Sequence, residues 1–297
     1  SEVITSNLEK PCSFDVASNP EFLREGSAIE DFLRPNRVVI GASSPQAIAI
    51  LQDLYRPLYL IETPFVITNV ETAEMIKYAS NAFLATKISF INEMANLSEK
   101  IGADVHMVAK GMGLDKRIGP KFLHPGPGFG GSCFPKDTMA LAKISRDNDL
   151  EFKIVEASIE VNKRQKNLMV DKINRSLGGL KDRKIAIWGL TFKPNTNDMR
   201  DAPSIDIIEG LLRDGATVKA FDPAGFTEAK EIFKDKIEFF NDMYKVAEGC
   251  DALVVITEWN QFRNLDFARL KQLLRAPVLV DLRNVYDPDQ MRQIGFR

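Results

Sequence analysis

The chain has 297 residues, 44% hydrophobic and 27% charged, and its 39 basic and 41 acidic residues leave a net charge of −2. This balance gives no electrostatic reason to expect a nucleic-acid or anionic-membrane partner, and no apolar run approaches the ~18 residues of a membrane-spanning helix. The three cysteines are few and far apart, and no Cys/His cluster has zinc-site spacing. We therefore expect a globular, cytoplasmic protein with reduced thiols and, at ~150 residues per domain, about two domains.

Residues 1 to 67 combine three short β-like runs with one helical stretch. The runs cover 14–17, 37–40 and 65–67, and the helical stretch covers 46–55. Short strands need a sheet to join, and this region offers too few strands to close one.

Two long helices are predicted in the middle of the chain. Between 69 and 101, apolar residues recur at intervals of three and four without Pro or Gly. A helix of about 30 residues is roughly 45 Å long, so we expect it to connect two domains or to pack against a partner subunit. A second helix is predicted from 152 to 177, ending at Gly178-Gly179.

The segment 114–136 between these helices is rich in Gly and Pro. Gly126, Gly128 and Gly131 have the spacing of a dinucleotide fingerprint, but we reject it because no strand precedes them and no helix follows. We expect these glycines to let the backbone approach a ligand, with amide groups free to cradle phosphate. A flexible connector, the alternative, would not require the Cys-x-x-Lys-Asp cluster at the end of this segment.

Cys133 is the candidate nucleophile of that cluster. If a helix begins near Phe134, its N-terminal dipole and Lys136 both favour a thiolate. Cys250 precedes an apparent core strand and is better interpreted as a small buried hydrophobe, and Cys12 is assigned no role.

Beyond residue 180 the pattern alternates between strands and helices. The predicted strands are 184–188, 217–221, 251–256 and 277–281, and the predicted helices are 204–213 and 267–274. Continuous apolar strands alternating with helices indicate a doubly wound parallel α/β sheet. Ligands of such sheets bind at the carboxyl ends of the strands, where Gly189, Asp222, Thr257 and Asp281 stand.

Three further pairs of polar residues have plain structural interpretations when each is taken alone. The pairs are Lys77 with Asn81, Glu21 with Glu25, and Lys193 with Arg200. Lys77, among core-facing residues, is typical of a snorkelling surface lysine, and the two glutamates are typical of a solvated helix face. The last pair follows a strand and suits phosphate, and a solvated loop is almost as typical.

Taken together, these segments resemble the UDP-glucose/GDP-mannose dehydrogenase family over nearly the whole chain, from about 16 to 294. The matching motifs are Ser18-Asn-Pro-Glu-Phe-Leu-Arg-Glu-Gly-Ser-Ala-Ile29, Lys77-Tyr-Ala-Ser-Asn-Ala-Phe83, Phe129-Gly-Gly-Ser-Cys-Phe-Pro-Lys-Asp137 and Gly189-Leu-Thr-Phe-Lys193. The Gly-Ser-Cys-Phe-Pro-Lys-Asp version favours members acting on UDP-glucose over the GDP-mannose relatives.

The resemblance implies a four-electron oxidation in which the C6 alcohol of UDP-glucose becomes a carboxylate while two NAD⁺ are reduced. Cys133 would add to the aldehyde, and the thiohemiacetal would lose hydride to give a thioester that water hydrolyses. Lys77 and Asp137 would move protons and stabilise oxyanions through an ordered water, and Glu21 would assist hydrolysis.

The same resemblance implies the binding residues. Asn81 would hold the sugar, and the rest of the UDP-glucose site would comprise Glu21, Phe22, Leu23, Arg24, Glu25, Lys77, Phe122, Leu123, His124, Pro125, Gly126, Gly130 and Lys193. Glu25, Lys136 and Arg200 would lie near NAD. Arg117 matches a residue that reaches the neighbouring subunit's substrate, which implies a homodimer built on the long helix. No metal is expected.

The family's NAD-binding domain opens with G-x-G-x-x-G, of which this sequence has no valid copy. We therefore expect residues 1–67 to be a remnant of an N-terminal NAD-binding Rossmann domain. Residues 68–179 would form a central helical region for dimerisation and the catalytic cysteine, and 180–297 a Rossmann-like UDP-binding domain.

Because most of the NAD site would be missing, we expect this chain alone not to turn over. The alternatives are a dehydrogenase of another nucleotide sugar and a catalytically silent nucleotide-sugar-binding or dimerisation module. A cysteine hydrolase using Cys133 and a histidine is disfavoured, because nothing supplies an orienting third group.

Overall fold

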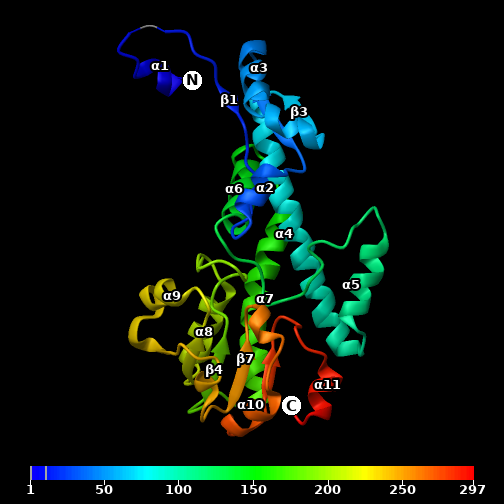
Figure 1. Ribbon diagram of the computed structural model, residues 1–297, viewed down its shortest axis with the longest axis vertical. Helices are drawn as coiled ribbons and strands as arrows, with labels where there is room; N and C mark the ends of the chain where they lie inside the picture. Colours follow the sequence, from blue (N-terminus) through cyan, green and yellow to red (C-terminus); the bar gives the residue numbers. More distant parts are fainter. Residues whose placement is uncertain (1, 11) are drawn as a thin grey trace. The chain divides into compact units, whose positions relative to one another are not determined.

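The computed structural model describes residues 2–10 and 12–297, and it divides into two compact units, 1–81 and 82–297. Many elements of both units are labelled in Figure 1.

The first unit contains a three-stranded sheet. Its elements are α1 (Glu2–Ser6), β1 (Ala17–Ser18), α2 (Ala28–Leu33), β2 (Val38–Ala42), α3 (Pro45–Leu54), the 3₁₀ helix η1 (Arg56–Ile61) and β3 (Phe65–Thr68). The central strand β2 pairs antiparallel with β1 and parallel with β3, and all five of its residues are buried. The predicted strand over 14–17 is wrong for its first three residues, because pairing begins only at Ala17.

The long helix is α4 (Val70–Ile101), whose 32 residues confirm the predicted helix. Asn69 begins it, since its side-chain oxygen accepts the Thr72 N–H at 2.9 Å and satisfies a donor of the first turn. The unbroken apolar periodicity explains why nothing interrupts the helix before Gly102.

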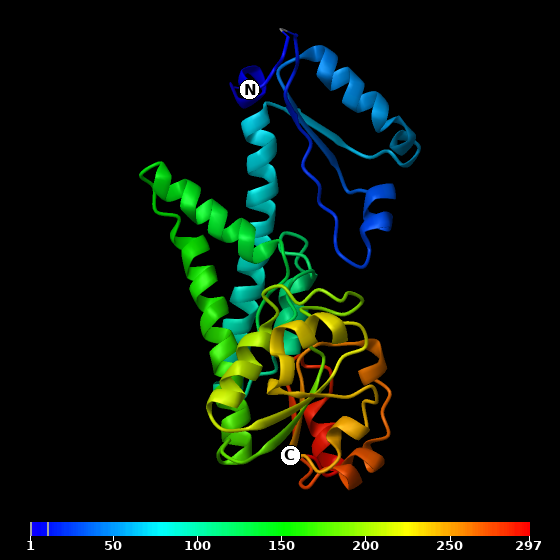
Figure 2. The same ribbon diagram turned by 90° about the vertical axis from the view of Figure 1, so that its left-hand side faces the viewer.

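Three more helices of the second unit follow, α5 (Val105–Leu114), α6 (Phe134–Asp147) and α7 (Lys153–Leu177). The second predicted helix is confirmed by α7, which ends at Gly178 with a left-handed φ of 65°. The expectation that no helix follows the glycines is wrong, because α6 begins at Phe134. In Figure 2, α6 and α7 form a helical hairpin.

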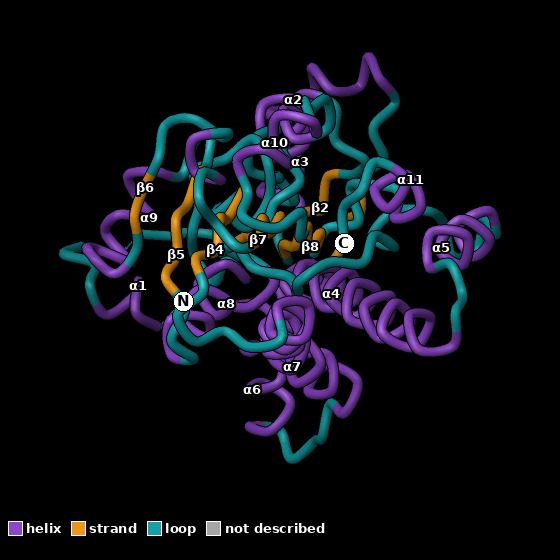
Figure 3. The backbone as a smooth tube through the Cα atoms, turned by 90° about the horizontal axis from the view of Figure 1, so that it is seen from below, coloured by secondary structure: helices purple, strands orange, loops and turns teal. Residues whose placement is uncertain are grey.

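The rest of the second unit is a five-stranded sheet. Its elements are β4 (Lys184–Trp188), α8 (Pro203–Arg213), β5 (Thr217–Phe221), α9 (Phe226–Phe233), η2 (Lys234–Lys236), β6 (Glu238–Phe239), η3 (Lys245–Ala247), β7 (Ala252–Val255), η4 (Asn260–Phe262), α10 (Phe267–Leu273), β8 (Leu279–Asp281) and α11 (Pro288–Gln293). The strand order is β6-β5-β4-β7-β8 (Figure 3). All pairs are parallel, which confirms the predicted parallel sheet.

Burial on both faces explains the continuous apolar strands. Ile185 and Ile187 of β4 pack in one cluster with residues of α7 and α8, whereas Ala186 and Trp188 pack in another with residues of η4 and α10. Successive side chains point to opposite faces, so a strand covered on both sides needs apolar residues at every position. Figure 3 shows α7 and α8 on one side of the sheet and α10 on the other.

No helix in the described part of the chain combines the length and the apolar character that crossing a membrane requires.

Candidate active site

In the first unit, the segment 19–25 is fixed to the sheet by Asn19. The Asn19 amide donates to the Val39 carbonyl at 2.7 Å and accepts the Tyr55 hydroxyl at 2.6 Å. Tyr55 was not among the residues that the sequence singled out, and it ties this segment to the end of α3.

Lys77 and Glu21 are brought together, as the motif reasoning requires. The Lys77 ammonium donates to the Glu21 carbonyl at 2.5 Å and to its carboxylate at 2.9 Å, and the lysine side chain is only 17% exposed. Lys77 is therefore not the snorkelling surface lysine of the plain interpretation. Asn81, one turn further along α4, is buried.

Phe22 and Arg37 form the other side of this cluster. The Arg37 guanidinium lies 3.5 Å from the centre of the Phe22 ring, and the Lys77 ammonium lies 5.4 Å from it. Such contacts are cation–π interactions. Burial lowers the pKa of Arg37, which donates to the Ser80 hydroxyl at 3.4 Å.

The side chain of Arg24 is committed to Asp31. Its guanidinium lies 2.6 Å from the carboxylate, and its backbone N–H donates to the same group at 2.9 Å. These hydrogen bonds lower the pKa of Asp31 to about 2. Beside it, the Leu23 N–H donates to the Glu21 carboxylate at 2.7 Å, and Glu25 is half-buried.

In the second unit, the loop from 121 to 133 runs without strand or helix and is largely buried. Side chains of α4 and α7 take up its backbone groups. Asn92 accepts the Gly126 N–H at 2.8 Å and Gln165 donates to the Gly126 carbonyl at 2.8 Å. Asn162 pairs with both backbone groups of Phe129, at 2.7 and 3.0 Å. The loop is thus a fixed element rather than a flexible connector.

The expectation that these amides stay free to cradle phosphate is wrong for three of them, at Gly126, Phe129 and Gly131. The first two donate to side-chain amides, and the Gly131 N–H donates to the Arg200 carbonyl at 2.8 Å. The glycines serve protein packing instead. A Cβ on Gly131, whose φ is 80°, would lie 2.7 Å from the Phe192 ring, and one on Gly130 would collide with the Asp201 carbonyl.

Cys133 stands at the N-cap of the 14-residue helix α6 and is half-buried. Its sulfur lies 3.5 Å from the Ser132 hydroxyl. One turn into the helix, Asp137 is almost completely buried and its carboxylate lies 2.5 Å from the exposed ammonium of Lys136. The predicted helix start is confirmed, and the helix dipole favours negative charge at this end. Lys136 makes an ion pair with the neighbouring carboxylate.

At the carboxyl edge of the five-stranded sheet, Asp222 joins three loops. Its carboxylate accepts the Leu190 N–H at 2.6 Å after β4, the Gly225 N–H at 2.7 Å after β5, and the Trp259 indole N–H at 3.3 Å after β7. Thr257 donates to the Thr191 carbonyl at 2.5 Å. The strand order changes direction between β4 and β7, which is the place where open α/β sheets bind ligands.

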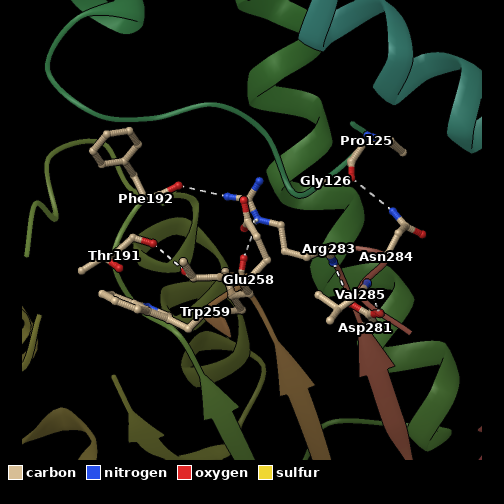
Figure 4. A network of polar contacts seen from close by, with 12 residues as sticks. Pro125, Gly126, Thr191, Phe192, Glu258, Trp259, Asp281, Arg283, Asn284 and Val285 are labelled. Atoms are coloured by element: carbon tan, nitrogen blue, oxygen red, sulfur yellow. Dashed lines mark hydrogen bonds and ion pairs between the residues drawn. The ribbon is translucent and has the colours of Figure 1, made fainter. Parts of the chain in front are cut away.

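Arg283, which follows the outermost strand β8, was missed in the sequence; its side chain reaches the segments that follow β4 and β7 (Figure 4). Its guanidinium donates to the carbonyls of Ile256 and Phe192 at 2.8 and 3.0 Å and lies 2.9 Å from the Glu258 carboxylate. A Cβ on Gly126 would lie 3.0 Å from it. The next residue, Asn284, donates to the Pro125 carbonyl at 3.2 Å.

The other predicted residues of this unit lie around the same loops. Phe122 has a positive φ of 64°, and the centre of its ring lies 6.0 Å from that of Phe134. Of the next three residues, Leu123 and Pro125 are buried and His124 is exposed. The Lys193 ammonium lies 5.2 Å from the Phe192 ring, and the side chains of Arg117 and Arg200 are held by Asp115 and Asp198.

Among the described residues, no group of His, Cys, Asp and Glu could hold a metal ion. The second unit contains a candidate cysteine nucleophile at a helix N-terminus and a doubly wound sheet whose carboxyl edge carries Arg283 together with carboxylates. These features define a nucleotide-binding α/β protein.

Comparisons with known proteins give the family. Residues 1–59, 71–164 and 186–288 match the sequence profiles of the NAD-binding, central and UDP-binding domains of the UDP-glucose/GDP-mannose dehydrogenase family. The chain is 53% identical to UDP-glucose 6-dehydrogenase of Rhizobium meliloti and 50% identical to that of Rickettsia bellii. The alignments cover 95% and 99% of this chain and 65% and 68% of those relatives.

A UDP-glucose dehydrogenase from Pyrobaculum islandicum has a similar structure, with a TM-score of 0.86 at 40% identity over 92% of this chain and 61% of that one. The chain belongs to the UDP-glucose/GDP-mannose dehydrogenase family. It spans about two thirds of the length of the relatives it matches. The predicted domain limits at 67/68 and 179/180, and the interpretation of residues 1–67 as a remnant, stay predictions.

Proposed function

We propose that the protein is an NAD-dependent oxidoreductase that converts UDP-glucose to UDP-glucuronate. The observation that carries this proposal is Cys133, placed at the N-terminus of α6 one turn before the buried carboxylate of Asp137. The names of the relatives and the matches to the family's NAD-binding and UDP-binding domains support the substrate and cofactor.

The chemistry that NAD⁺ would supply when bound is the acceptance of one hydride, so that two NAD⁺ in succession would serve the two two-electron steps. The exposed cations Lys136 and Arg200 fit the phosphates of a dinucleotide, and Glu25 is the proposed contact in the first unit. Asp137 and Lys77 hold and move the protons released as the alcohol becomes an aldehyde.

The Cys133 sulfur then adds to the aldehyde carbon to form a thiohemiacetal, and loss of the second hydride gives a thioester. Glu21 assists the water that breaks the carbon–sulfur bond, which releases the acid and restores the thiol. One substrate alcohol, two NAD⁺ and one water are consumed in each turnover. The Lys77–Glu21 ion pair keeps these two groups in one place before substrate binds.

The same proposal assigns substrate binding to backbone and side chains of the residues that the family motifs single out. Asn81 holds the sugar, and UDP-glucose is held by residues 21–25, residues 122–126, Gly130 and Lys193. The network of Arg283 supports this assignment, because it fixes residues 125 and 126 against the loop that precedes Lys193.

A homodimer formed through α4 is part of the proposal. Phe83, Phe90 and Leu97 are 66%, 48% and 50% exposed and stand seven residues apart, so they share one face of the helix. Exposed apolar side chains in one stripe are typical of a helix that packs against another chain. Light scattering should give twice the monomer mass, and Phe90→Glu should return the monomer.

The activity is tested by incubating the purified chain with NAD⁺ and UDP-glucose and measuring NADH and UDP-glucuronate. We expect two NADH per acid, and Cys133→Ser should abolish release of the acid. GDP-mannose and UDP-N-acetyl sugars, offered in parallel, test the alternative of another nucleotide sugar. UDP-glucuronate formed at the wild-type rate by the Cys133→Ser variant would rule out the assigned nucleophile.

The comparisons do not support the expectation that this chain alone is inactive, because residues 1–59 match the family's NAD-binding domain. The remaining alternative, a silent binding module, predicts that UDP-glucose binds in calorimetry without any NADH formation.

A further inference from the structure

The sulfur of Cys133 has a hydrogen-bond partner to which the motif reasoning assigned no role. The Ser132 hydroxyl makes a hydrogen bond with it, at an oxygen–sulfur distance of 3.5 Å. Although Cys133 is the N-cap residue of α6, its side chain makes no capping hydrogen bond with the first turn of that helix, which belongs to the described part of the chain. Among the described residues, the hydroxyl of Ser132 is therefore the hydrogen-bonding group that this sulfur meets.

The protonation state of the sulfur decides which of the two atoms donates. A thiol can donate its proton to the serine oxygen or accept the hydroxyl proton, whereas a thiolate has only lone pairs and can only accept. A hydroxyl beside a sulfur stabilises the anionic form, because hydrogen bonds to charged groups are stronger than those between neutral groups. The contact thus favours the form of Cys133 that attacks a carbonyl carbon.

Cys250 shows the opposite arrangement in the same unit. Its sulfur lies 3.3 Å from the carbonyl oxygen of Val246 and 3.9 Å from that of Glu248, and carbonyl oxygens only accept hydrogen bonds. Such partners keep the proton on the sulfur, and this cysteine is completely buried. The chain therefore places one cysteine beside acceptors and Cys133 beside a donor.

Both neighbours of Ser132 are fixed by backbone hydrogen bonds. On one side, the Gly131 N–H donates to the Arg200 carbonyl at 2.8 Å. On the other side, the Cys133 carbonyl accepts the Asp137 N–H at 2.9 Å as α6 begins. A serine side chain has a single rotatable bond between the backbone and its hydroxyl oxygen, so this donor is held near the sulfur before any substrate binds.

We propose that Ser132 is a further catalytic residue, whose hydroxyl donates a hydrogen bond to the Cys133 sulfur whenever that sulfur is anionic. This inference rests on the proposed function, in which the sulfur attacks an aldehyde and later leaves an acyl group. In that last step, water adds to the acyl carbon and gives a proton to Glu21, and the carbon–sulfur bond breaks with its electron pair returning to sulfur. The hydroxyl stabilises the thiolate at both stages.

The first test is alkylation of Cys133 by iodoacetamide in the unliganded full chain, which requires no nucleotide. Peptide mass spectrometry separates Cys133 from the exposed Cys12 and the buried Cys250. Ser132→Ala and Ser132→Gly remove the donor, whereas Ser132→Thr keeps a hydroxyl. The matched control is Ser176→Ala on α7, because that exposed hydroxyl donates to a carbonyl of its own helix and has no proposed role.

The quantity compared is the alkylation rate at pH 7 divided by the rate at pH 10. Because the same thiolate reacts at both pH values, its accessibility and its intrinsic nucleophilicity cancel, and the ratio reports how much of the sulfur is ionised at pH 7. We expect Ser132→Ala and Ser132→Gly to lower the ratio for Cys133 about fivefold, as for loss of one hydrogen bond. Ser132→Thr should keep most of the wild-type ratio, and Ser176→Ala all of it. The ratio for Cys12 should be the same in every variant.

A second test follows turnover with NAD⁺ and UDP-glucose. Ser132→Ala should lower kcat for acid formation about fivefold and leave the KM for UDP-glucose unchanged, because the hydroxyl acts on the attacking and leaving sulfur. An unchanged kcat would overturn its place in the reaction.

The inference is also overturned if Ser132→Ala and Ser132→Gly keep the wild-type alkylation ratio for Cys133, or if Ser176→Ala lowers that ratio to the same extent. If the wild-type chain oxidises no nucleotide sugar, the proposed function fails. The alkylation ratio then decides alone whether Ser132 stabilises the thiolate, since that measurement uses no substrate.

Discussion

The glycine-rich loop is held in place by α7, and Asn162→Ala tests that attachment. The buried amide of Asn162 satisfies the N–H and the carbonyl of Phe129 at 2.7 and 3.0 Å. Alanine leaves both backbone groups buried without a partner, and each such group costs ~1–3 kcal/mol. We therefore expect the free energy of unfolding of the second unit to fall by about 2–6 kcal/mol, the sum of the two costs.

The matched control is Asn167→Ala, because Asn167 is exposed on the same helix. Both substitutions gain the same helix propensity, so their difference reports the lost contacts. Trp188 and Trp259 are the only tryptophans of the chain and both belong to the unit 82–297, so their fluorescence in urea follows the unfolding of that unit. A stability for Asn162→Ala within ~0.5 kcal/mol of the control, the usual scale of exposed substitutions, would refute the reasoning.

Three further predictions concern packing and titration. Gly131→Ala should lower the free energy of unfolding, measured in urea, by roughly 1–3 kcal/mol, because the new Cβ would lie 2.7 Å from the Phe192 ring. The control is Gly111→Ala on α5, whose Cβ would meet no other atom and which should raise the free energy of unfolding by up to ~1 kcal/mol. Burial raises the pKa of Cys250 to about 11, so iodoacetamide at pH 8 should label it, by peptide mass spectrometry, only after unfolding. Arg24 lowers the pKa of Asp31 to about 2, so the stability that this pair contributes is present above pH 4 and is lost as the pH falls towards 2. Asp31→Asn should remove this pH-dependent contribution to stability, which unfolding followed by circular dichroism at each pH would measure.

The strands that could be predicted from the sequence are those buried on both faces. β4 and β5 have the predicted limits because a continuous apolar run between turn signals leaves few alternatives. β6 was missed because it has only two residues, one of them exposed, and α9 and α11 have only eight and six residues, too few to show a helical period. Short elements are fixed by tertiary pairing, which a local pattern does not contain.

The residues of the candidate site were likewise predicted only in part. Motif spacing found Cys133 and Asp137, because one helical turn separates them whatever surrounds the helix. It also found Lys77 and Glu21, which contact each other across 56 positions of sequence, but only through the family resemblance. Arg283 carried no local signal, since its partners come from the ends of other strands.

The polar residues of α7 did carry a signal. Its inward stripe follows the spacing of three and four, with Ser158, Asn162 and Gln165 in the first half and Met169 and Ile173 in the second, all buried. An irregular loop leaves backbone groups that need side-chain partners, whereas packing against a regular helix requires only apolar surface. Asn162 and Gln165 bind the loop, and the apolar half joins the core of the sheet with α8. Ser158, at the start of the stripe, donates to the Thr86 hydroxyl of α4 at 3.0 Å instead. A change from polar to apolar residues along one buried helix face therefore marks where the neighbouring backbone changes from irregular to regular.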